Sequence, residues 1–121
     1  MGDAWFTGVA DELARCLVDA ERCADACEAF LEEARESGDP ELQRRAVDAL
    51  VGPAAVARVL MDLIDHPPEL VMAAARLCRD SSRAAARALE ELGPPGGADV
   101  VSALRENADS CARLLEATDG R

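Results

Sequence analysis

The sequence predicts an all-α protein folded as an antiparallel, up-down-up-down four-helix bundle. Three observations support this prediction. The helix-forming residues Ala, Leu, Arg and Glu dominate a chain of 121 residues that has only two Phe and no Tyr. Apolar residues recur at the three- and four-residue spacing of a buried helix face. Three short segments rich in Gly, Pro or Ser divide this pattern into four helices, and the chain (residues 1–121) is long enough for one domain with one core.

The first helix is expected over residues 8–36, where the apolar side chains share one face. The segment Ser-Gly-Asp-Pro that follows ends this helix and starts the next. Gly38 suits the position just after a helix, where the backbone often turns left-handed. Asp39 can accept hydrogen bonds from the first free backbone N–H groups of a helix, and Pro40 fits the first helical turn.

The second helix is expected over residues 40–65, with Pro53 near its middle. A proline removes one backbone donor and crowds the preceding turn, so we expect a kink there. The His-Pro-Pro turn at 66–68 leads into a third helix over residues 68–92. The break Gly-Pro-Pro-Gly-Gly then precedes a fourth helix over residues 98–118.

Charge and composition exclude several classes of partner. The net charge is −11, and all 13 basic residues are Arg. We find no basic patch of the kind that binds phosphates, so nucleic acid is not an expected partner. The first 20 residues lack the basic start and apolar core of a secretory signal, and no apolar run is long enough to span a membrane. We therefore expect a cytoplasmic protein whose five cysteines are thiols rather than disulfides.

Three cysteines on the first helix form the most informative pattern. Cys16, Cys23 and Cys27 have the spacing Cys-x6-Cys-x3-Cys, which places them on one helical stripe together with core-forming apolar residues. The Cβ atoms of Cys23 and Cys27 should lie roughly 5–6 Å apart. This separation is too long for a relaxed disulfide, but it suits two thiolates that hold one soft metal ion. Cu(I) or Zn(II) would fit, and zinc is the weaker candidate because structural zinc sites favour four ligands on turns.

Two further cysteines extend the candidate site. At about 1.5 Å of rise per residue, Cys16, Cys78 and Cys111 come to similar heights on three helices, each on an inward face. The sequence thus indicates two sites, the Cys23/Cys27 pair and a Cys16/Cys78/Cys111 cluster. The competing interpretation is structural, because a free cysteine also packs as a small buried apolar residue.

Other potential ligands are less convincing. His66 is the only histidine and precedes Pro67 in a turn, where an exposed side chain is expected. Met61 and Met72 could bind Cu(I), but methionine at helical spacing is more often a core residue. The sequence lacks the Glu-x-x-His pairs of a di-iron site, a nucleophile with a histidine base, and a phosphate-binding glycine loop. No catalytic residue can be named, and we lean against an enzyme.

The chain resembles the cysteine-rich, four-helix-bundle copper storage proteins. The resemblance rests on Cys-x6-Cys-x3-Cys in the first helix, on residues 73–83 around Cys78, and on residues 107–113 around Cys111. It implies inward cysteines that bind Cu(I), largely as Cys-x-x-x-Cys pairs. This chain departs from that pattern, because Ser82 stands where a partner of Cys78 would be. The flanking positions of Cys111 are Asn107 and Leu115, and the second helix has no cysteine.

These observations favour a cytoplasmic protein that holds one or a few Cu(I) ions through Cys16, Cys23, Cys27, Cys78 and Cys111. It would act as a low-capacity store, buffer or carrier. One alternative is a copper-dependent enzyme built on the same bundle. Another is a metal-free helical module that acts through protein contacts. The sequence also leaves open a homo-oligomer or another protein partner.

Overall fold

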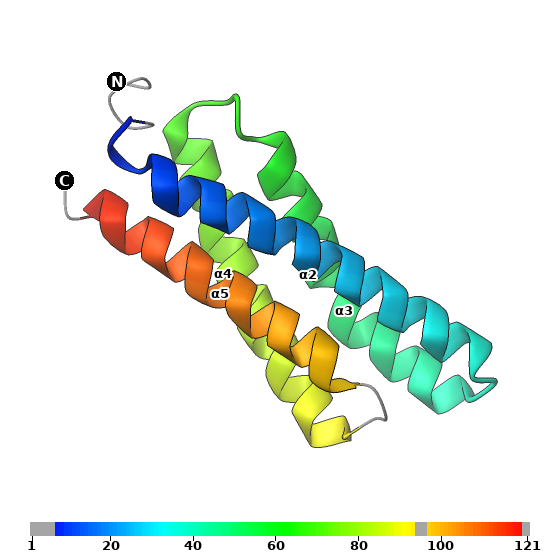
Figure 1. The fold of residues 1–121 in the computed structure, drawn as a ribbon. Coiled ribbons are helices and arrows are strands. Elements are labelled where there is room, and N and C mark those ends of the chain that lie inside the picture. The colour runs from blue at the N-terminus through cyan, green and yellow to red at the C-terminus, as the bar shows by residue number, and fades with distance from the viewer. Residues whose placement is uncertain (1–6, 94–96, 120–121) are drawn as a thin grey trace.

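The computed structural model describes residues 7–93 and 97–119 and shows four long α-helices (Figure 1). These are α2 (Ala10–Glu36), α3 (Pro40–Asp62), α4 (Pro68–Leu92) and α5 (Gly97–Asp119). Helix α2 packs against α3 and α5, and α4 packs against the same two helices. Successive helices run in opposite directions, so the start of α2 and the end of α5 lie at the same end of the bundle (Figure 1). The described part of the chain has no strand, and the predicted all-α, antiparallel four-helix bundle is confirmed.

The observed helices differ from the expected ranges by only a few residues at their ends. The largest difference is in α3, which ends at Asp62 and not at residue 65. The next residues form a turn in which the His66 N–H donates to the Leu63 carbonyl at 2.9 Å. The cause is Pro67, which disfavours helical geometry at the residue before it and has no N–H to continue the helix. Of the turn expected between the third and fourth helices, residues 94–96 lie outside the described ranges.

Helix α3 remains helical through Pro53, which is buried in the bundle. The helix therefore continues past the missing backbone donor. The kink expected at this residue stays a prediction.

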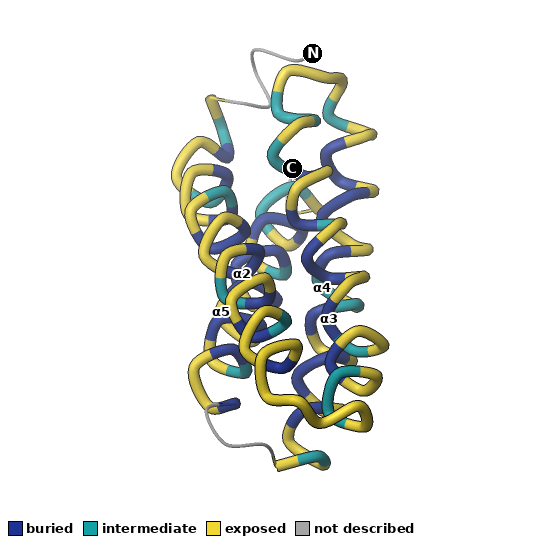
Figure 2. The backbone as a smooth tube through the Cα atoms, turned by 90° about the vertical axis from the view of Figure 1, so that its right-hand side faces the viewer, coloured by how far each residue is buried: buried dark blue, intermediate teal, exposed yellow. Residues whose placement is uncertain are grey.

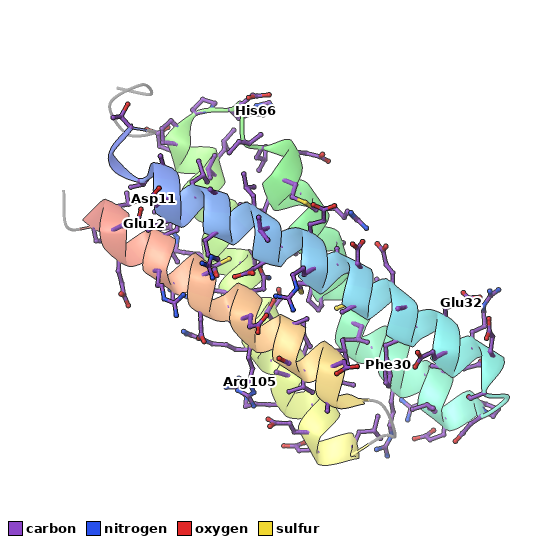
Figure 3. All side chains as sticks on the ribbon, in the orientation of Figure 1. Asp11, Glu12, Phe30, Glu32, His66 and Arg105 are labelled. Atoms are coloured by element: carbon purple, nitrogen blue, oxygen red, sulfur yellow. The ribbon has the colours of Figure 1, made fainter. Side chains whose placement is uncertain are left out.

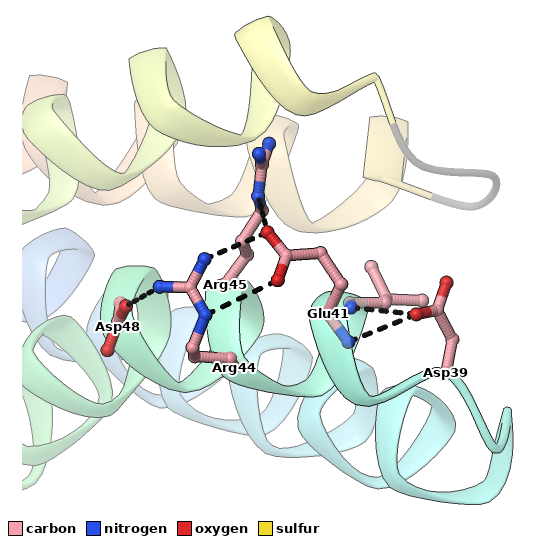
Figure 4. A network of polar contacts seen from close by, with 6 residues as sticks. Asp39, Glu41, Arg44, Arg45 and Asp48 are labelled. Carbon is pink, nitrogen blue, oxygen red and sulfur yellow. Dashed lines mark hydrogen bonds and ion pairs between the residues drawn. The ribbon is translucent and has the colours of Figure 1, made fainter.

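The turn between α2 and α3 has the chemistry that the sequence indicated (Figure 4). Gly38 has a positive φ of 75°, a conformation that glycine adopts without steric cost. One carboxylate oxygen of Asp39 accepts hydrogen bonds from the backbone N–H groups of Glu41 and Leu42, at 3.1 and 3.3 Å. Glu41 in turn forms ion pairs with Arg44 and Arg45 on the exposed face of α3. The cap is the larger contribution, because exposed ion pairs add little to stability.

Small side chains fill much of the core. Buried positions face the interior along all four helices, and exposed positions face outward (Figure 2). One core cluster, near the α3–α4 turn, includes Val9, Leu60 and Val71. A second cluster, toward the α2–α3 turn, includes Phe30 and Leu50. Alanine and cysteine account for more than half of the buried apolar residues, which lets the helices approach closely.

Length and hydropathy also bear on whether the described helices could enter a membrane. None of them combines enough length with enough apolar character to cross a lipid bilayer.

The Asp39 cap gives the first testable prediction. Asp39→Ala should lower the free energy of unfolding by about 1 kcal/mol, because two N–H groups at the start of α3 lose their acceptor. Asp39→Asn, whose side-chain oxygen can still cap the helix, should keep most of the stability. Urea denaturation followed by circular dichroism measures both variants. Equal destabilisation by Ala and Asn would show that charge, and not capping, is the property that matters.

Candidate metal centre

All five cysteines are free thiols, and all are fully buried between the helices. They come from three helices. Helix α2 carries Cys16, Cys23 and Cys27, α4 carries Cys78, and α5 carries Cys111. The buried residues of α3 are Ala, Leu and Pro, which have no side-chain donor atoms. The bundle therefore has three thiol-bearing helices and one helix whose buried face is entirely apolar.

Cys23 and Cys27 form the first thiol group, on consecutive turns of α2 within the second core cluster. Their side chains share a hydrogen bond. This bond lowers the pKa of Cys23 against the opposing effect of burial, and Ser82 and Asn107 add to the lowering. The same bond, together with burial, raises the pKa of Cys27. One thiol of the pair thus ionises first, and the other remains a hydrogen-bond donor to it.

Cys16, Cys78 and Cys111 form the second thiol group, within the first core cluster. The Sγ atoms of Cys16 and Cys111 lie 3.5 Å apart. A hydrogen bond with Cys111 is the main influence that lowers the pKa of Cys78 to about 7, with smaller contributions from Asn107 and Ser82. Bonding to Cys16 and Cys78, with burial, raises the pKa of Cys111. The helical rise predicted that these three thiols would be at one height, and they do lie in one part of the core.

The second thiol group is not a ready-made three-ligand site. Among the residues that the structure describes, no three His, Cys, Asp or Glu side chains are grouped so that they could hold one metal ion together. The Cys16/Cys78/Cys111 cluster therefore stays a prediction as a metal site. The Sγ atoms of Cys16 and Cys111 face each other, and Cys78 accepts a hydrogen bond from the Asn107 amide at 2.9 Å. Cys111 is the thiol of this group that contacts both of the others.

Asn107 and Ser82 link the two thiol groups. The Asn107 Nδ2 donates to Cys78 Sγ at 2.9 Å and to Ser82 Oγ at 3.1 Å. Ser82 Oγ lies 4.0 Å from Cys23 Sγ, and the Cys111 thiol lies 3.9 Å from Asn107 Oδ1. Both residues are fully buried. The core thus holds a continuous series of polar side chains, with thiols on both sides of an amide and a hydroxyl.

Sequence reasoning identified the positions of Asn107 and Ser82 but not their contacts. In the sequence, both stand out only as residues at positions where the family resemblance implies cysteine. Their spacing of four residues from Cys111 and Cys78 already places them on the inward faces of α5 and α4. A buried amide is costly to leave unpaired. From this cost, one could have inferred that the two polar residues on these faces are hydrogen-bond partners.

A second buried polar contact was missed entirely. The Ser110 hydroxyl donates to the carboxylate of Asp19 between α5 and α2, and Asp19 also lies 4.0 Å from the Arg22 guanidinium. The carboxylate is 7% exposed. It borders a shallow pocket that Arg15, Glu106 and Arg113 also line. The side chains that contact the Asp19 carboxylate are a hydroxyl and a guanidinium group rather than thiols.

The remaining candidate ligands lie apart from the thiols. His66 is exposed in the turn between α3 and α4, at one end of the bundle (Figure 3). Met72 is buried in the first core cluster, where its sulfur accepts a hydrogen bond from Thr118 at 3.5 Å. Met61 is half-buried at the edge of the same cluster. These positions agree with core packing for the methionines and an exposed turn for the histidine.

Comparison with known proteins decides the family. A family model described as copper storage protein matches residues 9–116, which is most of the chain. The chain belongs to the copper storage protein family. The match covers all three thiol-bearing helices and α3. A search of curated proteins and a search of solved structures each gave no significant match.

The hydrogen bond between Cys111 and Cys78 gives the second testable prediction. In the metal-free, reduced protein, the ultraviolet absorbance of thiolate should rise as the pH passes through about 7, because Cys78 ionises there. Below that pH Cys78 is protonated, and above it Cys78 is a thiolate. Cys111→Ala removes the main stabilising donor and should move this step to higher pH.

Cys16→Ala is the matched control, because it also removes one buried thiol from the second thiol group but no direct donor to Cys78. It should leave the step near pH 7 in place. A step that is absent from the wild-type protein, or that shifts equally in both variants, would contradict the assignment to Cys78.

Proposed function

We propose that this protein binds one or a few Cu(I) ions through Cys16, Cys23, Cys27, Cys78 and Cys111. It would serve as a low-capacity copper store, buffer or carrier in the cytoplasm. The observation that carries the proposal is the presence of five buried, reduced thiols in two contacting groups, in a chain of the copper storage protein family. Five thiols limit the capacity to a few ions.

The donor set supports Cu(I) over harder metals. Thiolate is a soft ligand that favours Cu(I) over harder ions, and the side-chain donors of both groups are thiols. Cu(I) is satisfied by two thiolates, which the contacting pairs can supply. Zinc prefers four ligands in a tetrahedron. Neither thiol group offers four.

Ionisation prepares the thiols for the metal. A thiol must lose its proton before it binds, so copper uptake competes with protons. Cys23 and Cys78 have lowered pKa values, and each belongs to a different thiol group. Each group thus contains one cysteine that becomes a thiolate more readily than an ordinary thiol and can take the first bond to the metal.

Burial suits a cargo that must be kept from water and oxidants. All five sulfur positions are sealed from solvent by the packed helices. Copper held there would be shielded from small oxidants, and the apolar residues of α3 would close one side of the site. A reducing compartment is needed to keep such thiols free, which supports the cytoplasm as the location.

The third testable prediction is that the fully reduced protein removes Cu(I) from a coloured competing chelator under anaerobic conditions. Uptake should saturate at one to a few equivalents. Cys23→Ser/Cys27→Ser and Cys16→Ser/Cys111→Ser should each lower this stoichiometry, because each removes one contacting pair. The variant with all five cysteines changed to Ala should retain its helical circular dichroism and take up no copper.

The same titration can refute the proposal. Ala24→Ser/Ala75→Ser is a matched control that changes two buried core residues without removing a thiol. If it lowered the stoichiometry as much as the cysteine variants did, loss of packing and not loss of ligands would explain the effect. No uptake by the wild-type protein above the chelator would reject copper binding outright.

A further inference from the structure

We propose that Asn107 and Ser82 divide the thiols into two separate copper sites. One site is Cys23/Cys27, and the other is built on Cys16 and Cys111 with Cys78 beside them. This inference rests on the proposed copper binding and adds how the copper is partitioned. The observation that supports this division is the position of an amide and a hydroxyl between the two thiol groups.

The contacts place Asn107 at the centre. The two hydrogens of its Nδ2 are both used, one toward Cys78 Sγ at 2.9 Å and one toward Ser82 Oγ at 3.1 Å. Ser82 continues the series to Cys23, 4.0 Å away, and Oδ1 of the amide faces the Cys111 thiol at 3.9 Å. In this series of contacts, the sulfur atoms of the two thiol groups are connected only through oxygen or nitrogen atoms of Ser82 and Asn107.

Neither side chain is a useful ligand for Cu(I). The nitrogen of a carboxamide has its lone pair delocalised, and its hydrogens repel a cation. The hydroxyl of Ser82 and the carbonyl oxygen of Asn107 are hard donors, whereas Cu(I) prefers thiolate. A copper ion bound to Cys23 therefore has no soft neighbour at the position of Ser82 or Asn107 through which a cluster could extend.

The positions also explain why the division occurs here. Ser82 lies four residues after Cys78, and Asn107 lies four residues before Cys111. A cysteine at either position would complete a Cys-x-x-x-Cys pair on an inward helix face. Because both positions are fully buried and adjacent, two new thiols would face each other in the middle of the bundle.

The fourth testable prediction concerns Ser82→Cys/Asn107→Cys, which should join the two sites into one cluster. Fully loaded wild-type protein should show no short copper–copper contact bridging the two thiol groups, as measured by X-ray absorption. The double variant should gain copper–copper scattering and the luminescence of a multinuclear Cu(I)–thiolate cluster, and it should bind more copper. Ala84→Cys/Ser102→Cys adds two thiols at exposed positions of the same helices and should gain neither signal.

Independence of the sites can be measured without the added cysteines, which matters if the double variant fails to fold. Cys23→Ser/Cys27→Ser should leave the affinity of the remaining site within about twofold of its wild-type value, since non-interacting sites are additive. A larger change, or a single wild-type cluster on all five thiols, would overturn the division while leaving copper binding intact. No copper uptake by the wild-type protein would overturn both proposals.

Discussion

The hydrogen bonds of Asn107 are the constraint on which the centre of the bundle depends. A buried carboxamide left without partners costs roughly 1–3 kcal/mol, which is a large part of the stability of a small domain. Here it is satisfied by Ser82 and Cys78 of α4, and by Cys111 on its own helix. Among the described residues, no buried side-chain nitrogen or oxygen lacks a partner. The amide thus fixes the rotation of α5 relative to α4 at the same level where the two thiol groups meet, so the polar network determines both the packing and the arrangement of the thiols.

Because the core residues are small, this hydrogen-bond network has a large influence on how the helices are oriented. Alanine is the most frequent buried residue, and a core of such small side chains tolerates small rotations of the helices better than interlocking large side chains do. Hydrogen bonds between buried side chains therefore determine more of the relative orientation of the helices than they would in a core of large residues. The Ser110–Asp19 bond fixes α5 against α2 in a similar way. Helix α3 has no buried polar side chain, and it is held to the bundle by apolar contacts and by exposed ion pairs of Arg58 with Asp25 and Glu28 of α2. The helices that carry the thiols are thus the ones joined by buried hydrogen bonds.

Much of this architecture follows from the sequence. Apolar periodicity and turn residues give the four helices, and a constant helical rise brings Cys16, Cys78 and Cys111 to one region. The pairing of Cys16 with Cys111 could not be predicted, because it depends on rotations of about one residue that the periodic pattern does not resolve. The partners of Asn107 and Asp19 were missed for a related reason. Periodicity shows which face is buried, but hydrogen bonds depend on which side chains of different helices meet there. The end of α3 shifted because Pro67 outweighs the apolar pattern that continues through Leu63.

The state of the thiols without metal bears on what kind of copper protein this can be. A structural metal site commonly leaves its ligands repelling one another, so that the protein unfolds when the metal is removed. Here the thiols already satisfy one another: Cys23 with Cys27, and Cys111 with Cys16 and Cys78. Copper bound as proposed would replace these hydrogen bonds with Cu–S bonds, and its loss would allow them to re-form. The fold can therefore persist with and without the ion, and binding need not be coupled to folding. A fold that is stable without metal suits a metal ion that is taken up and released as cargo. It argues against a metal whose main role is to hold the helices together.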